Sequence, residues 1–398
     1  MNSEKAVITI LGMVGGSDIH QKAVYYFEDK KEDKKEYFNT LPLLIDTYSN
    51  EYKIVPFYTK EAKSVNEKVL EKSNLEFKDF DKKYFIEDDK DFIKLFNIIN
   101  SAVDEYSELI IDVSHGFRHF PILMIVDLII QNFKDSSKIK KILFAKEITQ
   151  FKEYEIIDLK EYLDLANIAF VLTTFERNYT VASHIKSEKY KKLLKELNDF
   201  SNDLMALNLG NLFKSANELI QELDKVEDVS IKNQAQSLKN VIKTLSDFDG
   251  KKRYVVYYEL SKNLFEKKYM LLSLALLFES IRMYIKSSIK VKQKELVENI
   301  EKQLHYDLYK IGDFFKNLKW KSYEKLKYDK NNSLNISEDD YKSLQKSFPN
   351  HLEKIYDEIN NKRNNLAHAN TSSSFQDIEK DIANLLFKYE SLAIKKPI

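Results

Sequence analysis

A short polar segment late in the chain carries residue types that could cut RNA. Arg363 and His368 are five residues apart in the run Asn360–Ala369, so on a helix they lie within about 140° of each other. Arginine can clamp a phosphate, and histidine can exchange a proton near neutral pH. Such a pair suffices when the 2′-hydroxyl attacks its own phosphate, because the substrate then supplies the nucleophile and no metal is needed. The alternative is a solvated helix end with an incidental histidine, and the spacing alone does not decide between them.

A second segment, residues 111–121, combines a hydroxyl, an imidazole, a glycine and an arginine. Its candidate binding residues are Ser114, His115, Gly116 and Arg118. They follow a predicted strand and precede Pro121, which suits the first turn of a helix. A helix N-terminus with a nearby arginine suits a phosphate or the edge of a nucleobase. A Ser–His nucleophile pair, for which no third orienting carboxylate is evident, and a turn without a ligand are the alternatives.

A third candidate is the glycine-rich turn after the first apolar run of the chain. Its candidate binding residues are Gly12, Gly15, Gly16 and Ser17. In an open parallel sheet, ligands bind beyond the carboxyl ends of the strands, where glycines let the backbone approach a phosphate or a base. The spacing fits neither the dinucleotide fingerprint nor a phosphate-binding P-loop. An ordinary glycine turn is therefore the alternative.

Residues that bind metals are sparse in this sequence. The chain has no cysteine, which excludes disulfides, thiolate metal sites and cysteine nucleophiles. His115 and His119 are four residues apart, but Gly116 and Arg118 lie between them and no third ligand is evident. We therefore expect no metal site and no metal cofactor.

Two hydrophobic periods predict the elements that position these residues. Over residues 1–165, β-branched runs alternate with helical stretches such as 92–103 and 120–133, which indicates βαβ units and a mostly parallel sheet. The predicted strands cover residues 6–11, 52–58, 109–113, 141–145 and 154–157, with a short extra hairpin near 24–27. Pro56 should lie at a strand end or on an edge strand. The glycine turn and the 111–121 segment both follow strands, so we expect them on one edge of the sheet.

After about residue 159 only helical periodicity remains. The predicted helices cover residues 162–174, 194–223, 254–285, 297–315 and 375–392, and the polar stretch 329–340 is expected to be a loop. Segment 268–285 is apolar almost all round, so it should be a central helix or a subunit interface. The fold class is thus α/β plus all-α, with a mostly parallel sheet followed by a helical bundle.

Length and charge set broader limits. A chain of 398 residues predicts two or three domains, and 43% hydrophobic residues exclude a disordered chain. The net charge of zero divides into −7 over residues 1–165 and +7 over residues 166–398, which is too mild to identify a polyanion partner. No apolar run is long enough to span a membrane and no signal-peptide pattern is present, so we expect a soluble, cytoplasmic protein.

Taken together, these motifs resemble one family, the CARF–HEPN ribonucleases that accompany type III CRISPR systems. Asp112-Val113-Ser114-His115-Gly116-Phe117-Arg118 is similar to the segment D-[ILV]-[ST]-H-G-[FL]-R of the nucleotide-sensing CARF domain. Residues 156–167 resemble the family's exit from that domain into its first helix. Arg363-Asn364-Asn365-Leu366-Ala367-His368 fits the HEPN pattern R-x(4–6)-H, with the frequent polar residue after the arginine. The glycine turn departs from the commoner L-G-T-G form, because Met13 and Val14 are inserted.

The resemblance implies a sensor and an effector in one chain. Residues 1–165 would be a Rossmann-like CARF domain, residues 166–255 a helical connecting region and residues 256–398 a HEPN ribonuclease domain. The CARF residues named above would bind a cyclic oligoadenylate activator, for which we favour cyclic tetra-adenylate over hexa-adenylate although the sequence does not give the ring size. Arg363, Asn364 and His368 would cut single-stranded RNA and leave a 2′,3′-cyclic phosphate. Both sites would be composites at the two-fold axis of a homodimer or a higher even oligomer.

Two other functions stay open. The chain could be a ligand-gated regulator that binds a partner or DNA and cuts nothing, although no helix-turn-helix signature stands out and Arg363 and His368 would then be unexplained. The CARF domain could also degrade its own cyclic ligand, with Ser114 or Ser17 positioning the ribose hydroxyl. That activity could coexist with RNA cleavage.

Overall fold

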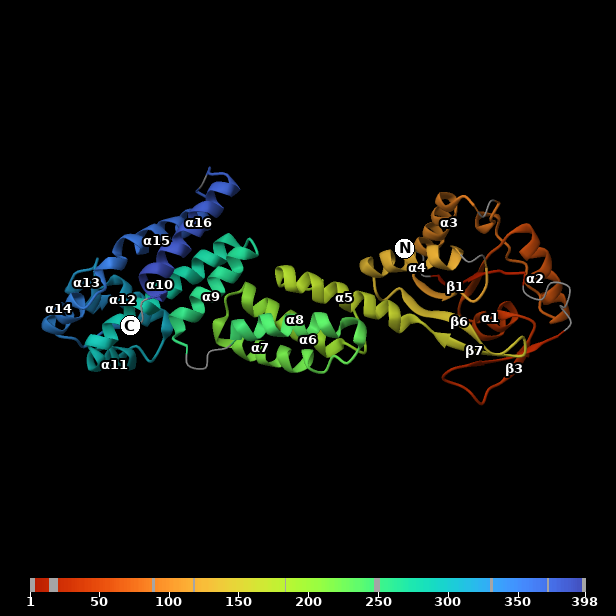
Figure 1. The fold of residues 1–398 in the computed structure, drawn as a ribbon, viewed down its shortest axis with the longest axis horizontal. Coiled ribbons are helices and arrows are strands. Elements are labelled where there is room, and N and C mark those ends of the chain that lie inside the picture. The colour runs from red at the N-terminus through yellow and green to blue at the C-terminus, as the bar shows by residue number, and fades with distance from the viewer. Residues whose placement is uncertain are drawn as a thin grey trace. The chain divides into compact units, whose positions relative to one another are not determined.

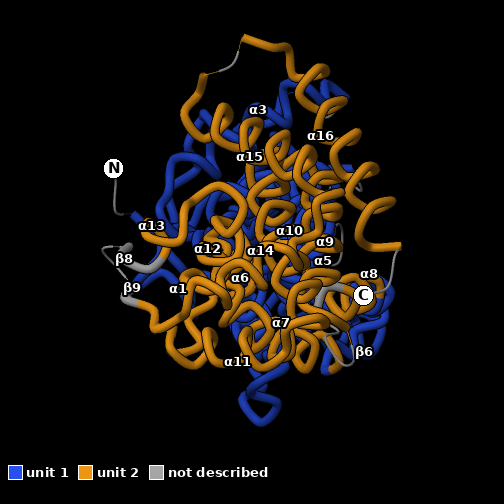
Figure 2. Tube along the Cα trace, turned by 90° about the vertical axis from the view of Figure 1, so that its left-hand side faces the viewer, with its two compact units in different colours: residues 1–198, 225–236 blue, residues 199–224, 237–398 orange. Residues whose placement is uncertain are grey.

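The chain divides into two units, which Figure 2 colours separately. The first comprises residues 1–198 and 225–236, and the second residues 199–224 and 237–398. The computed structural model describes residues 4–13, 21–87, 90–116, 119–182, 184–246, 251–329, 332–370 and 372–395. The three-part division at residues 165 and 255 stays a prediction.

The first unit is built on a seven-stranded sheet in the order β3-β2-β7-β6-β5-β1-β4 (Figure 1). Its strands are β1 Lys5–Ile10, β2 Ala23–Phe27, β3 Lys35–Tyr37, β4 Lys53–Phe57, β5 Glu108–Asp112, β6 Ile139–Thr149 and β7 Glu153–Asp158. The pairs β1–β4, β1–β5, β5–β6 and β2–β7 are parallel, and β6–β7 and β2–β3 are antiparallel. The mostly parallel sheet is therefore confirmed, and Pro56 lies on the edge strand β4, where its missing N–H is harmless.

Helices cover both faces of this sheet, which explains why its central strands are apolar on both sides. Ala6, Ile8 and Ile10 pack in one core with α3 (Phe92–Glu105) and α4 (His119–Lys134). Val7 and Leu11 pack in the opposite core with α1 (Thr40–Tyr48) and α2 (Lys60–Lys72). The expected βαβ alternation stops after β6, because β6 continues to Thr149 and turns directly into β7 as a hairpin. The predicted hairpin near 24–27 also exists, but β2 joins the main sheet beside β7.

The rest of the chain is helical. It contains α5 Lys160–Asn178, α6 Lys191–Met205, α7 Leu209–Leu223, α8 Val229–Ser246, α9 Arg253–Glu266, α10 Met270–Lys292, α11 Lys294–Gln303, α12 Leu308–Asn317, α13 Tyr323–Lys327, α14 Glu338–Lys346, α15 Glu353–Ala367 and α16 Phe375–Tyr389. The two-stranded hairpin of β8 (Tyr328–Asp329) and β9 (Asn332–Ser333) lies within the predicted loop 329–340, which ends early because Ser337 caps α14 with a capping box.

Three of the predicted long helices are each two helices in the structure. The breaks fall at Leu207, Lys268 and His305, where φ is +52°, +67° and +52°. A left-handed residue ends a helix and is usually glycine. Because this chain places other residues at these ends, hydrophobic periodicity runs through the breaks and hides them.

The predicted central helix is confirmed by α10 of the second unit. Leu274, Leu277, Ile281 and Ile285 are fully buried in a core that also includes residues of α9, α12, α15 and α16. This apolar segment therefore packs inside the second unit. Among the described residues, no helix has the length and apolar character needed to cross a membrane.

Candidate functional site

The first candidate site is the carboxyl edge of β1 and β5. These strands are parallel neighbours with Thr9 beside Asp112, so the segments that follow them leave the sheet at the same edge. Gly12 follows one strand, and the run Ser114–Gly116 follows the other. The structure therefore brings the described parts of the two predicted motifs to one edge, as expected from the sequence. Gly15, Gly16, Ser17 and Arg118 lie outside the described residues.

Asp112 is a buried hydrogen-bond acceptor that holds this edge of the sheet together. It is 1% exposed and accepts hydrogen bonds from the hydroxyls of Thr9 (2.7 Å), Thr40 (3.1 Å) and Ser114, and from the Ser114 amide (3.1 Å). A buried carboxylate is tolerated when its oxygens are satisfied in this way. The Ser114 hydroxyl also accepts from the Ala145 amide at 2.8 Å, which ties the turn to β6. The proton of the Ser114 hydroxyl is thus held by Asp112, so Ser114 and His115 do not form the nucleophile pair considered above.

Two buried amide side chains hold Gly12, the first residue of the predicted glycine turn. Asn66 donates from Nδ2 to the Gly12 carbonyl at 3.1 Å and accepts at Oδ1 from Asn39 at 2.9 Å. Asn39 in turn caps α1 by accepting from the Leu41 amide at 3.1 Å. Asn39 and Asn66 are only 2% and 1% exposed. These two side chains were missed by the sequence analysis, because no motif distinguishes them from ordinary polar residues.

Gly116 can only be glycine in this conformation. Its φ is +107°, and a Cβ atom placed on it would lie 2.3 Å from Cγ2 of Ile10. The turn after β5 therefore lies directly against β1. This close approach links the two segments that the sequence predicts to share a ligand.

His115 lies in this turn with its Nε2 atom buried and without a hydrogen-bond partner in the described part of the chain. Burial lowers the pKa of His115 because it disfavours the charged imidazolium, and the nearby Asp112 opposes the shift only in part. The ring is therefore neutral at pH 7.

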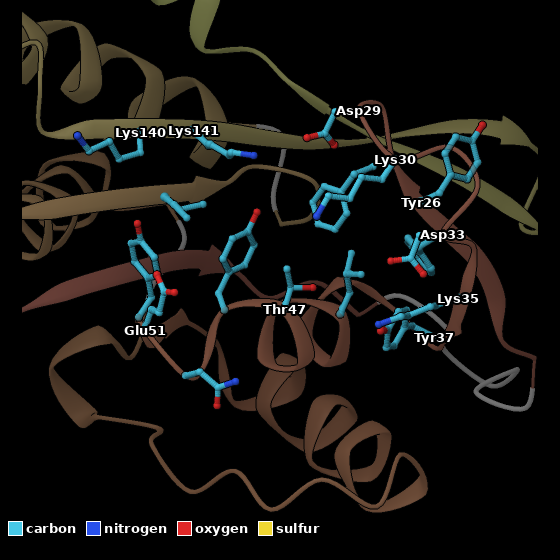
Figure 3. Close-up of a pocket in the computed structure, with 17 residues that line it drawn as sticks. Tyr26, Asp29, Lys30, Asp33, Lys35, Tyr37, Thr47, Glu51, Lys140 and Lys141 are labelled. Carbon is cyan, nitrogen blue, oxygen red and sulfur yellow. The ribbon is translucent and has the colours of Figure 1, made fainter.

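A separate cavity of about 550 Å³ opens in the same unit (Figure 3). It is lined by aromatic residues that include Tyr37, Tyr48 and Tyr52 and by the lysines 30, 35, 140 and 141. None of the described residues predicted to bind a ligand lines it. Part of its lining is already committed within the protein, since Tyr37 donates to Asp46 at 2.6 Å and Tyr52 donates to Glu108.

The second candidate site lies at the end of α15. Nη2 of Arg363 donates to Oδ1 of Asn364 at 2.7 Å, and the guanidinium lies 4.5 Å from the centre of the Phe278 ring on α10. Within the described residues no carboxylate lies at ion-pair distance from Arg363. Its neighbour Lys362, by contrast, is paired with Asp381. Arg363 is thus a half-buried cation with a fixed orientation, and within the described residues no carboxylate neutralises its charge.

His368 follows where this helix ends. Its backbone amide donates to the Asn364 carbonyl at 3.0 Å, and Ala369 then takes a left-handed φ of +52° that terminates the helix. The imidazole is on an exposed residue, about one and a half turns beyond Arg363. All three predicted catalytic residues therefore lie on the last two turns of one helix, with direct side-chain contact between Arg363 and Asn364.

The residues that pack beneath Arg363 were not predicted from the sequence. Arg282 is 2% exposed, donates to Glu279 at 2.6 Å and to the Tyr309 carbonyl at 3.0 Å, and lies 5.6 Å from the Phe278 ring. Gly312 leaves room for it, because a Cβ there would lie 2.7 Å from Nη2 of Arg282. An arginine inside the apolar segment 268–285, in a chain with so few arginines, was the signal available in the sequence.

The fold and the two sites define a two-part protein, in which a mostly parallel α/β sheet accompanies a helical bundle that carries Arg363 and His368 at the end of one helix. No protein-family model matches the chain, and no curated protein sequence matches it. Among solved structures, the chain is similar to Enterococcus italicus Csm6 bound to cyclic hexa-2'-fluoro-hexa-dAMP, with 12% sequence identity and a TM-score of 0.39. The match covers 98% of this chain and 93% of that chain.

Proposed function

We propose that this protein is an endoribonuclease of type III CRISPR antiviral defence, activated by a cyclic oligoadenylate and independent of metal ions. The observation that carries the proposal is Arg363, an oriented guanidinium without a carboxylate partner in the described structure, on the same helix end as His368. An arginine without a carboxylate partner in the described structure and an exposed histidine at the same helix end suit a phosphodiester, which needs charge stabilisation and proton transfer. The substrate is single-stranded RNA.

The proposed reaction is attack of a ribose 2′-hydroxyl on its neighbouring phosphorus. The P–O5′ bond breaks, the hydroxyl proton is lost, and the leaving 5′-oxygen gains a proton. Arg363 stabilises the negative charge that develops on the phosphoryl oxygens, and Asn364 orients Arg363 through the 2.7 Å hydrogen bond. His368 transfers the proton, or positions the 2′-hydroxyl if it stays neutral. The products are a 2′,3′-cyclic phosphate and a 5′-hydroxyl.

The carboxyl edge of the sheet is the proposed activator site. Gly12, Gly116 and the neutral His115 lie on that edge, and Ser114 holds its turn in place. Gly15, Gly16, Ser17 and Arg118 complete the proposed set, with Arg118 supplying the positive charge. A cyclic oligoadenylate has repeated phosphates and bases, which backbone amides and one arginine can bind. We favour the tetra-adenylate ring.

The test is cleavage of a labelled single-stranded RNA by the wild-type protein and by Arg363→Ala and His368→Ala, with and without cyclic tetra- or hexa-adenylate. Each substitution should lower the rate by about 10²–10⁴ while activator binding, measured by calorimetry, is unchanged. Cleavage should persist in EDTA, and polynucleotide kinase should remove the 3′-terminal phosphate of the product. A magnesium requirement or a free 3′-hydroxyl would contradict the proposed chemistry.

The activator site has its own test, because Arg118→Ala removes the proposed charge without touching the nuclease residues. Loss of one charge-assisted hydrogen bond should weaken activator binding ten- to a hundredfold, equivalent to about 1.5–3 kcal/mol. Calorimetry with both rings measures this change and also identifies the ring size. Unchanged affinity in Arg118→Ala would show that the activator binds elsewhere.

A further inference from the structure

A series of ring contacts connects Arg363 to the single tryptophan of the chain. The Arg363 guanidinium lies 4.5 Å from the centre of the Phe278 ring, and the ring centres of Phe278 and Tyr356 are 5.4 Å apart. Tyr356 then stacks on Trp320 with a centre separation of 5.0 Å and an angle of 29° between the planes. All four residues belong to the second unit, so the indole is held three contacts away from the guanidinium.

Trp320 is only partly buried. Tyr356 covers one face of the indole, and Phe348 approaches at 5.8 Å with its ring perpendicular, yet the residue remains 42% exposed. The stacked contact and the perpendicular contact together hold the indole, while a large part of the residue stays open to solvent. An aromatic ring that is held in place and partly exposed is the kind of surface on which nucleobases stack.

The charges around this ring favour RNA as the occupant. Lys319, next to Trp320, is paired with Glu353 at 3.3 Å, and Lys316 is paired with Asp313 at 2.8 Å. Of the cations next to these rings, Arg363 is therefore the one that has no carboxylate partner within the described structure. Single-stranded RNA is bound by aromatic rings that stack on its bases together with cations that contact its phosphates, and Trp320 and Arg363 supply one group of each kind.

We infer that Trp320 is a binding subsite for an unpaired base of the RNA substrate, a few nucleotides from the phosphate held by Arg363. The inference rests on the proposed ribonuclease function and adds a determinant of substrate affinity to it. Phe278 and Tyr356 act as positioning residues, because they fix the distance between the indole and the guanidinium.

The single tryptophan makes the subsite directly observable. The His368→Ala protein, which should leave RNA intact, is titrated with single-stranded oligouridylate in the presence of the activating ring while indole fluorescence is excited selectively. Stacking should quench the emission in a saturable way. An oligonucleotide of the same length that lacks its bases should cause little quenching, because it offers phosphates but no ring. Equal effects of the two probes, or no quenching at all, would overturn the inference.

Variants of Trp320 test the effect on cleavage. Trp320→Ala should raise KM for single-stranded RNA on the order of tenfold to a hundredfold with a smaller change in kcat, and Trp320→Phe should recover much of the loss. Phe387→Ala, which removes an aromatic residue 68% exposed on α16, is the matched control and should change neither constant. Thermal unfolding of each variant separates lost binding from lost folding.

The remaining outcomes separate this subsite from the proposed function. Normal KM in a folded Trp320→Ala protein that cleaves RNA would overturn the subsite and leave the ribonuclease intact. Quenching without cleavage by the wild-type protein would support the subsite and contradict the ribonuclease. Indole emission that depends on protein concentration alone, with weaker self-association of Trp320→Ala, would assign the surface to a second copy of the chain and overturn the inference.

Discussion

At the scale of single residues, Arg363 differs from the other cations nearby in what surrounds it. Its planar guanidinium is held on one side by the amide oxygen of Asn364 and lies over the Phe278 ring. A planar guanidinium can make both contacts and still present further N–H donors to a ligand, whereas an ammonium is a compact point charge. The same geometry that orients the group also leaves it without a carboxylate among the residues described.

Arg363→Lys therefore tests whether charge alone suffices. We expect it to retain activator binding but to lose most of the cleavage rate, close to the loss in Arg363→Ala, because an ammonium cannot present a planar fork of N–H donors to the phosphate. Single-turnover cleavage measures the effect. A lysine variant with nearly normal activity would mean that the contacts with Asn364 and Phe278 have no catalytic role.

Gly116 offers a second test at this scale. Gly116→Ala should destabilise the protein by about 2 kcal/mol or more, because an L-residue at φ +107° is strained and the new Cβ would overlap Ile10. Gly210→Ala is the matched control, since the nearest atom to its new Cβ is 4.0 Å away and alanine favours the helix. Urea denaturation compares the two. Equal stabilities would show that the turn relaxes freely.

His115 makes the stability of the folded protein depend on pH. Its pKa is lowered in the folded protein by burial, against about 6.5 when unfolded. Above that value both states bind no proton and the full stability is present. As the pH falls below it, only the unfolded state takes up the proton, so stability is lost at up to about 1.4 kcal/mol per pH unit until the folded pKa is reached. Unfolding of the wild-type protein should therefore depend on pH more steeply than that of His115→Gln as the pH falls below about 6.5; parallel curves would contradict this.

At the scale of elements, α4 exposes an apolar stripe in the first unit. Ile122, Val126 and Ile130 recur every four residues and are 64%, 43% and 41% exposed. Residues at this spacing lie on one helix face. Since α10 is buried within the second unit, the two-fold interface expected from the sequence needs another surface, and this stripe is the one we favour.

The double variant Ile122→Glu/Ile130→Glu should be monomeric at micromolar concentration, where we expect the wild-type protein to be a dimer, because two buried charges per subunit would be left unpaired at the proposed interface. Sedimentation measures the shift. Val229→Glu, at an isolated residue 88% exposed on α8, is the control. An unchanged dimer in the double variant would place the interface elsewhere.

At the scale of the whole molecule, the proposal requires that activator binding in one unit changes cleavage in the other. Such coupling is reciprocal for equilibrium binding, so RNA bound to His368→Ala should tighten activator binding by the same factor as the activator tightens RNA binding. Calorimetry with and without oligouridylate measures both factors. Identical activator affinity in the two conditions would indicate that the activator controls the catalytic step and not RNA binding.

The sequence alone determined the features that depend on local pattern. Apolar β-branched runs identified β1, β4, β5 and β7, because strands buried on both faces need them. The order of glycine turn, Ser114–Arg118 segment and late Arg363–His368 pair suggested the family. The apolar segment around residues 268–285 identified the central helix for the same reason, since most side chains of α10 are buried in the core of the second unit.

Tertiary structure decided what depends on partners distant in sequence. Asp112 is an anchor because Thr9, Thr40 and Ser114 converge on it, and Gly116 is required because Ile10 lies behind it. Helix ends at left-handed residues such as Leu207 leave no hydrophobic signature. The path from Arg363 through Phe278 to Trp320 joins elements that are separated along the chain, so no local spacing could reveal it. Contacts of this kind arise only when helices pack side by side, and packing is a property of the folded chain.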